Sequence, residues 1–142
     1  MSSVARRYYE RGRASLDSGD LESAQEAFRA ALDLAPQFGN ARVAYGVALA
    51  KAGDCPRAAQ VLRAGLGRAS SPISAAAIHA TLGDVLTLGG DFFGAEEAFQ
   101  TARQTPGFEA RAAAGLARVY ARLSRFADMA AQLQIAAAAS KR

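Results

Sequence analysis

The side chains that most often perform catalysis or bind metals are scarce in this chain. Its 142 residues include one histidine, His79, and one cysteine, Cys55. A zinc site needs three or four convergent Cys, His or carboxylate ligands at suitable spacing. The residues three and four positions from His79 are alanine, leucine and glycine, so neither a nucleophile nor an orienting carboxylate accompanies a general base. We expect no catalytic residue, no metal and no cofactor, and the chain is predicted not to be an enzyme.

Both residues have structural explanations. His79 is expected to pack in a partly buried position. Cys55 precedes Pro56 at the start of an expected helix, where the helix dipole can lower a thiol pKa. A redox switch would suit that setting, but the chain has no second cysteine for an internal disulfide. A structural role is favoured for both side chains.

Arginine is the side chain whose spacing does suggest binding. Arg111, Arg118 and Arg122 are seven and four residues apart, which places them on one face of a helix. The planar guanidinium group binds carboxylates and phosphates through two parallel hydrogen bonds. Residues 103–142 hold seven Lys or Arg against two Asp or Glu, whereas residues 1–102 hold ten against eleven. The net charge of +4 therefore comes from the C-terminal end, although a GC-rich, bacterial genome also produces many Ala and Arg residues.

The elements that position these side chains repeat along the chain. Gly-Asp occurs at 19–20, 53–54 and 90–91, each time between two apolar, helix-like runs. With Ser124-Arg125 as a fourth, degenerate copy, the intervals are 34, 37 and 34 residues. This is the length of a helix–turn–helix repeat. Each glycine suits the left-handed end of a helix, and the following aspartate can cap the next helix.

Within each unit, the same residue types recur at the same places. They are Tyr8, Gly12, Ala24, Phe28, Ala31 and Pro36 in the first unit; Tyr45, Gly46, Leu49, Ala58 and Leu62 in the second; Leu82, Gly83, Leu86, Ala95, Phe99, Ala102 and Pro106 in the third; and Leu116, Ala117, Tyr120, Met129, Leu133 and Ala136 in the fourth. This order resembles the tetratricopeptide repeat over roughly residues 5–140. The small residues Gly12, Gly46, Gly83 and Ala117 are expected to let the second helix of each unit approach the first.

The resemblance implies an all-α fold, a right-handed α-solenoid of about four helix–turn–helix repeats with about eight helices. We expect a single domain over 1–142 with repeats at 5–38, 39–72, 76–109 and 110–142. The expected helices are 4–18, 21–34, 38–52, 56–68, 74–89, 92–104, 108–123 and 126–140, with no strand.

In that family the first helices of the repeats line a concave groove, and their offsets from the packing glycine give the residues that face it. The residues implied to bind a partner there are Arg6, Tyr9, Glu10, Arg13, Asn40, Val43, Ala44, Val47, Lys51, Ala77, Ala80, Thr81, Asp84, Thr87, Arg111, Ala114, Arg118 and Arg122. Family members that hold acidic chaperone tails use a Lys and Asn clamp, and this chain keeps only Arg13 among the matching positions. An apolar anchor over Val43 and Val47, with acidic groups near Arg118 and Arg122, would complement the surface.

The C-terminus lacks the polar capping helix with which stacked repeats usually close. Met129, Leu133 and Ile135 and the alanine run after them are followed only by Ser140-Lys141-Arg142. Three alternatives stay open: self-association with a second copy, contact with a partner subunit, or an alanine-rich face left in water.

The sequence as a whole predicts a non-enzymatic scaffold or adaptor that binds a peptide or helix of a partner protein in the groove. The alternative is a nucleic-acid-associated protein that uses Arg111, Arg118, Arg122 and Arg125 on phosphates, although Tyr120 is the one aromatic residue among them. We expect a cytoplasmic protein, because the N-terminus has no apolar export region and no run is long and apolar enough to span a membrane.

Overall fold

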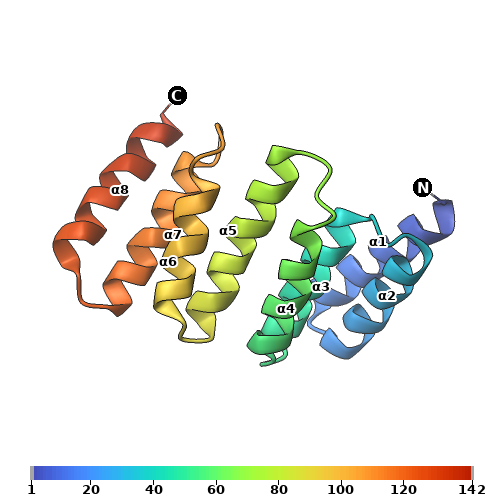
Figure 1. Cartoon of the computed structure of the whole chain (residues 1–142). Coiled ribbons are helices and arrows are strands. Elements are labelled where there is room, and N and C mark those ends of the chain that lie inside the picture. The colour runs from blue at the N-terminus through green and yellow to red at the C-terminus, as the bar shows by residue number, and fades with distance from the viewer. Residues whose placement is uncertain (1, 142) are drawn as a thin grey trace. The chain divides into compact units, whose positions relative to one another are not determined.

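The computed structural model describes residues 2–141, and it contains eight helices and no strand among them (Figure 1). All eight predicted helices are present, and their ends differ from the predicted ones by at most two residues. The helices are α1 (Ser3–Ser18), α2 (Leu21–Leu34), α3 (Gly39–Lys51), α4 (Cys55–Leu66), α5 (Pro72–Leu88), α6 (Phe92–Ala102), α7 (Glu109–Arg122) and α8 (Phe126–Ser140).

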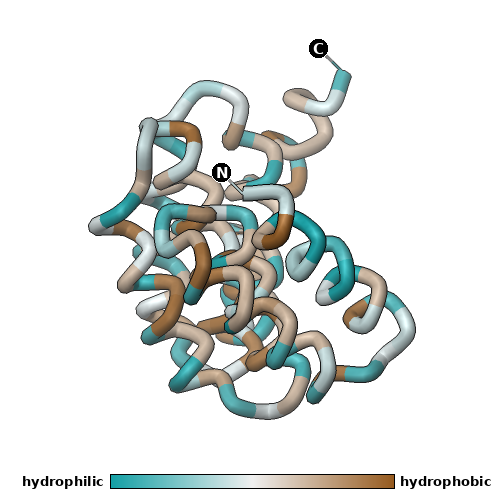
Figure 2. The backbone as a smooth tube through the Cα atoms, turned by 90° about the vertical axis from the view of Figure 1, so that its right-hand side faces the viewer, coloured by the Kyte–Doolittle hydropathy of each residue, from teal (hydrophilic) through white to brown (hydrophobic). Residues whose placement is uncertain are grey.

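The helices form two compact units, separated between Ala69 and Ser70. Unit 1 holds α1 to α4 and unit 2 holds α5 to α8. Within each unit, every helix packs against the next one along the chain, and the two odd-numbered helices also touch each other. Teal and brown alternate along most of the helical tube in Figure 2, as expected for helices with one buried and one exposed face. A single domain over residues 1–142 stays a prediction.

The turns inside the helix pairs follow the predicted chemistry. Gly19, Gly53 and Gly90 have φ values of 84°, 93° and 87°, in the left-handed region that favours glycine. The aspartate after each glycine caps the next helix; for example, a carboxylate oxygen of Asp91 accepts a hydrogen bond of 3.0 Å from the backbone N–H of Gly94. In the fourth pair Ser124 has a φ of 58° and no side chain caps α8. The degenerate copy therefore keeps the turn but lacks the cap.

Glycine, which has no side chain, sets the distance between the two helices of a pair. In the third pair, a Cβ added at Gly83 would come within 2.7 Å of the ring of Phe99, closer than real Cβ contacts allow. Phe99 is 1% exposed, and its ring also contacts Gly115 on α7, a contact that the sequence pattern does not predict. Phe99 is therefore held between α5 and α7. The equivalent pairs in unit 1 are Gly12 with Phe28 and Gly46 with Leu62.

Helix α8 differs from the other helices because none of its residues is buried. Leu133 occupies the place that Phe99 has in α6, counted from the preceding turn, yet it is 50% exposed. The reason is that no further helix follows α8 among the described residues, so only its side toward α7 is covered. The end of unit 2 thus exposes an apolar helix face.

The glycine contact can be tested by adding a single methyl group. We expect Gly83→Ala to lower the free energy of unfolding by about 1–3 kcal/mol, because the methyl group collides with the ring of Phe99. Gly39→Ala is the matched control, since a Cβ there meets nothing within 4 Å. The control should be neutral or stabilising by up to about 1 kcal/mol. Urea denaturation of both variants measures the difference, and equal effects would contradict the packing role.

Candidate functional site

The two side chains with intrinsic reactivity are isolated. His79 is half-buried in α5, and burial lowers its pKa below the usual value of 6.5. Cys55 is the first residue of α4, with Pro56 in the same helical turn. No group of three His, Cys, Asp or Glu that could hold a metal ion occurs in residues 2–141. No helix in the described part of the chain is long and apolar enough to cross a membrane.

In unit 1 the predicted binding residues are partly occupied by packing. The ring of Tyr9 lies 6.1 Å from that of Phe28 and 4.9 Å from that of Phe38, so Tyr9 supports the core between α1 and α3. Its hydroxyl oxygen accepts a hydrogen bond of 3.3 Å from Arg13, whose guanidinium lies 5.8 Å from the ring centre. Tyr9 and Arg13 therefore act as one amphipathic group.

The other predicted residues of unit 1 lie on α1 and α3. Val43 and Val47 are half-buried on α3, one turn apart. Arg6, Asn40 and Lys51 are exposed. The structure thus offers a small apolar strip on α3 with polar residues at both ends of the helix.

In unit 2 the structure brings three predicted residues into direct contact. Asp84 on α5 forms ion pairs with two arginines of α7, one at each carboxylate oxygen. Arg118 donates to Oδ1 at 2.9 Å, and the guanidinium of Arg111 lies 3.5 Å from Oδ2. The Arg118 side chain is 60% exposed and the Asp84 side chain 43%. The site therefore holds a carboxylate on an open surface between two guanidinium groups.

A buried hydroxyl group orients Arg111. Thr81 is buried on α5, and its Oγ1 donates a hydrogen bond of 2.9 Å to the carbonyl oxygen of Ala77. The same oxygen accepts a hydrogen bond of 3.2 Å from Arg111. Because that hydroxyl is already fixed by the backbone, it holds one guanidinium nitrogen in place. The same nitrogen, Nη2, lies 3.5 Å from Oδ2 of Asp84.

Apolar side chains lie along α5 on the same side as Asp84. Ile73 is eleven residues before Asp84 and Leu88 four after it, spacings that return to the same helical face. They are 64% and 65% exposed, although α5 is otherwise largely buried. We call this surface the arginine face; it consists of Ile73, Ala77, Asp84 and Leu88 on α5 and Arg111, Ala114, Arg118 and Arg122 on α7.

Arg122 completes the arginine face differently. Its guanidinium lies 5.1 Å from the ring centre of Phe92, at the start of α6. Among residues 2–141, no carboxylate lies within ion-pair distance of it. Arg122 is therefore positioned by an aromatic ring and its charge is not neutralised by a neighbour.

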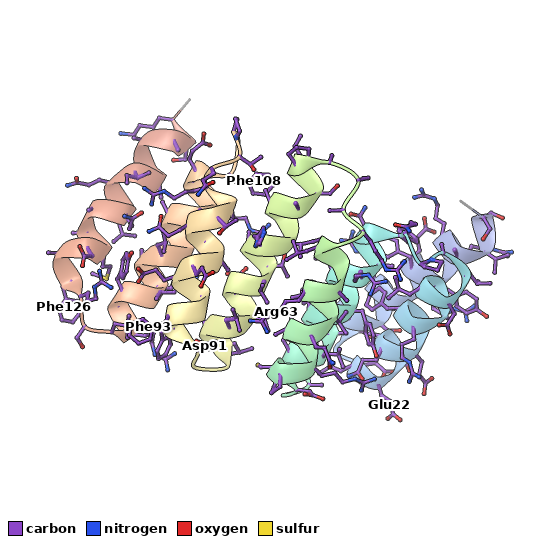
Figure 3. All side chains as sticks on the ribbon, viewed as in Figure 1. Glu22, Arg63, Asp91, Phe93, Phe108 and Phe126 are labelled. Atoms are coloured by element: carbon purple, nitrogen blue, oxygen red, sulfur yellow. The ribbon has the colours of Figure 1, made fainter. Side chains whose placement is uncertain are left out.

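Sequence reasoning missed two surfaces. Phe93 and Phe126, near the starts of α6 and α8, point outward at the turn end of unit 2 (Figure 3), and Phe93 is 77% exposed. The places equivalent to Phe93 in α2 and α4 hold Glu22 and Pro56, so repeat packing does not require a phenylalanine there. That comparison between units could have revealed it.

The second surface is an open pocket of about 210 Å³ on α1. It is lined by Val4, Arg7, Tyr8 and Arg11, and the guanidinium of Arg11 lies 5.4 Å from the ring centre of Tyr8. The equivalent place to Arg11 holds Tyr45 in α3 and Leu116 in α7. The first helix thus has a solvated, basic outer face where later helices are apolar.

The three residues expected to mediate self-association differ in orientation. Leu133 and Ile135 are exposed, whereas Met129 is half-buried on the side of α8 toward α7. The open face of α8 consists of Phe126, Ala130, Leu133 and Ala137, and no charged residue occurs from Met129 to Ser140.

The repeated geometry agrees with comparisons to known proteins. Residues 9–72 match a family model described as tetratricopeptide repeat, which covers most of α1 and all of α2, α3 and α4. Residues 9–72 belong to the tetratricopeptide repeat family. The glycine and phenylalanine contacts of unit 2 extend the same tetratricopeptide packing beyond the matched residues.

Solved structures of other proteins share the fold over most of the chain. MamA from Desulfovibrio magneticus RS-1 has a TM-score of 0.79 at 23% identity, covering 96% of this chain and 76% of that chain. Another MamA structure has a TM-score of 0.73 at 19% identity, covering 96% and 73%. A mutant O-GlcNAc transferase from Thermobaculum terrenum has a TM-score of 0.70 at 22% identity, covering 84% of this chain but 23% of that one.

At these identities the similarity shows the fold alone, an α-solenoid of helical repeats, as predicted. No match to this chain is found among curated proteins. Helical repeats of this kind typically serve as protein-binding scaffolds.

The half-buried position of His79 predicts a pH dependence of stability. Its pKa is lowered in the folded state, so the unfolded state binds more protons once the pH falls below about 6.5. The free energy of unfolding should therefore decrease between pH 7 and pH 5, and His79→Gln should remove part of that decrease. Urea denaturation of both proteins at the two pH values measures this decrease. A decrease of the same size in wild type and in the variant would rule out a contribution from His79.

Proposed function

We propose that the chain is a non-catalytic scaffold whose arginine face binds an acidic segment of a partner protein. The observation that supports this most directly is the carboxylate already held there, since Asp84 accepts a hydrogen bond from Arg118 and forms a second ion pair with Arg111. A geometry that holds one carboxylate suits another of the same shape. Arg122, whose charge is not neutralised, offers a further contact on the same helical face.

Apolar contacts would supply much of the affinity. A single exposed ion pair contributes only about 0.2–1 kcal/mol, which is too little for specific binding. Ile73 and Leu88 are 15 residues apart on α5, about 22 Å along the helix, the length of roughly seven extended residues. A segment with central acidic residues between two large apolar residues would satisfy both the arginines and these exposed side chains.

The remaining predicted residues fit a secondary role. In unit 1, Val43 and Val47 would accept an apolar side chain of a partner, with Asn40 and Lys51 available for polar contacts. Such contacts would form a separate site on unit 1 for the same class of partner.

The observed ion pairs weigh against the nucleic-acid alternative. Arg125 pairs with Glu96 at 3.2 Å and Asp128 at 2.9 Å, and Arg111 and Arg118 share Asp84. Three of the four arginines that would contact phosphates are thus already partly neutralised. Nucleic-acid affinity depends on unneutralised cations along the backbone. A protein segment with few, well-placed carboxylates is the better complement.

The experiment is a titration with three labelled probes at fixed salt. One is an octapeptide with two central glutamates between leucines, the second its glutamine twin, and the third a 20-nucleotide single-stranded DNA. We expect wild type to prefer the glutamate peptide, and Arg118→Glu to weaken that binding at least about tenfold. Arg63→Glu, an exposed arginine on α4 (Figure 3), is the control and should change binding less than about twofold.

Two results would reject this proposal. Equal binding of the glutamate and glutamine peptides would remove the role of the arginines. Tighter binding of the DNA than of either peptide, lost in Arg118→Glu but kept in Arg63→Glu, would establish the nucleic-acid alternative.

We further propose that two copies of the chain associate through the open face of α8. Phe126, Ala130, Leu133 and Ala137 are spaced by four, three and four residues, which forms one apolar stripe along the helix. Its alanines allow a second helix to approach closely, and the absence of charge from Met129 to Ser140 suits an equally uncharged partner helix. The outer face of α1 carries Arg7 and Arg11 and is a poorer match for it.

Sedimentation measures this association. Leu133→Glu should shift the protein toward the monomer, because it places a carboxylate in the middle of the apolar stripe. Leu34→Glu is the control, since Leu34 on α2 is similarly exposed, at 53% against 50%. A wild-type protein that stays monomeric at all accessible concentrations would show that the α8 face is left in water.

A further inference from the structure

Asp84 is unusual in its own helix. It is the one acidic residue of α5, whose 17 residues include no lysine or arginine. The equivalent places in the other odd-numbered helices, counted from the turns, hold Arg13, Val47 and Arg118. The repeat architecture therefore does not require a carboxylate at this position, and its presence has to be explained by what it contacts.

The ion pairs of Asp84 are not needed to hold α5 against α7. Those helices are already fixed by the ring of Phe99, which lies between Gly83 and Gly115 and is 1% exposed. The Asp84 and Arg118 side chains are 43% and 60% exposed, and exposed ion pairs contribute little to stability. The carboxylate thus lies on a surface whose helices are held together by other contacts.

We propose that Asp84 is a resident carboxylate, which occupies Arg111 and Arg118 in the free protein and is displaced by a carboxylate of the bound segment. This inference rests on the proposed function of the arginine face and adds its selectivity. A ligand with one weakly held acid gains little by replacing Asp84. A ligand that also reaches Arg122, which no carboxylate of residues 2–141 neutralises, gains a net contact. Asp84 would therefore select segments with at least two neighbouring acidic residues.

If Asp84 supported the binding site, removing its charge would weaken peptide binding. The exchange predicts that peptide binding becomes tighter. Removing the charge of Asp84 frees two guanidinium groups without removing any group that contacts the ligand. Asp84→Asn, which keeps the shape of the side chain, should tighten binding of the glutamate octapeptide by about threefold to tenfold. The variant should also bind a peptide with a single glutamate almost as well as one with two, since no resident carboxylate has to be displaced.

Calorimetric titration of the full chain with the two-glutamate, one-glutamate and glutamine octapeptides tests this. Glu96→Gln is the matched control, because Glu96 pairs with Arg125 at 3.2 Å outside the arginine face. It removes the same charge from the protein and should leave binding unchanged. In Asp84→Asn/Arg118→Gln the gain should disappear, which shows that the freed arginine is responsible. A thermal melt of each variant confirms that it is folded.

Unchanged or weaker binding by Asp84→Asn, with wild type still preferring the glutamate peptide, would overturn the exchange and leave the proposed function standing. An equal gain in Glu96→Gln would attribute the effect to net charge and would also overturn it. Failure of both wild type and Asp84→Asn to distinguish glutamate from glutamine would reject the exchange and the acid-binding face together.

Discussion

The contact between a glycine on one helix and a large apolar side chain on the next is the constraint on which the fold depends. Phe28 lies against Gly12, Leu62 against Gly46 and Phe99 against Gly83. No other residue has a side chain small enough to allow these distances, so each contact fixes how closely a helix pair packs. Once the two helices of a pair are packed together, one face of each helix is buried in the core and the other is exposed to solvent.

That constraint also builds the candidate site. Because Phe99 touches Gly83 and Gly115 together, α5 and α7 are held at the separation at which Arg111 and Arg118 reach Asp84. Packing positions the charges, and the proposed exchange requires only that the arginines change partners. A surface that is ordered before binding loses little conformational entropy when a ligand arrives. A rigid scaffold whose surface ion pairs exchange, as we propose, would suit the recognition of short acidic segments.

The sequence predicts the local features and the glycines at which paired helices approach each other, and it leaves out the ion pairs between helices. Helix ends, left-handed glycines and aspartate caps are set by residues within one turn, so the repeated Gly-Asp predicts them well. Asp84, Arg111 and Arg118 are each predicted as binding residues, but their mutual ion pairs depend on side-chain directions across two helices. The exposure of Ile73 and Leu88 depends on which neighbours cover α5, and Met129 turns toward α7 for the same reason. The spacing of residues in the sequence gives neither the side-chain directions across two helices nor the neighbours that cover a helix.

The central claim is that a carboxylate of the partner meets Arg118, and a double-mutant cycle measures this most directly. The cycle combines Arg118→Gln in the protein with a single glutamate-to-glutamine change in the two-glutamate octapeptide, and compares the four binding free energies. The account predicts a coupling energy of about 0.5–1 kcal/mol between the two changes, as for an exposed ion pair. A coupling energy of zero for each glutamate in turn would contradict it, because the two groups would then act independently.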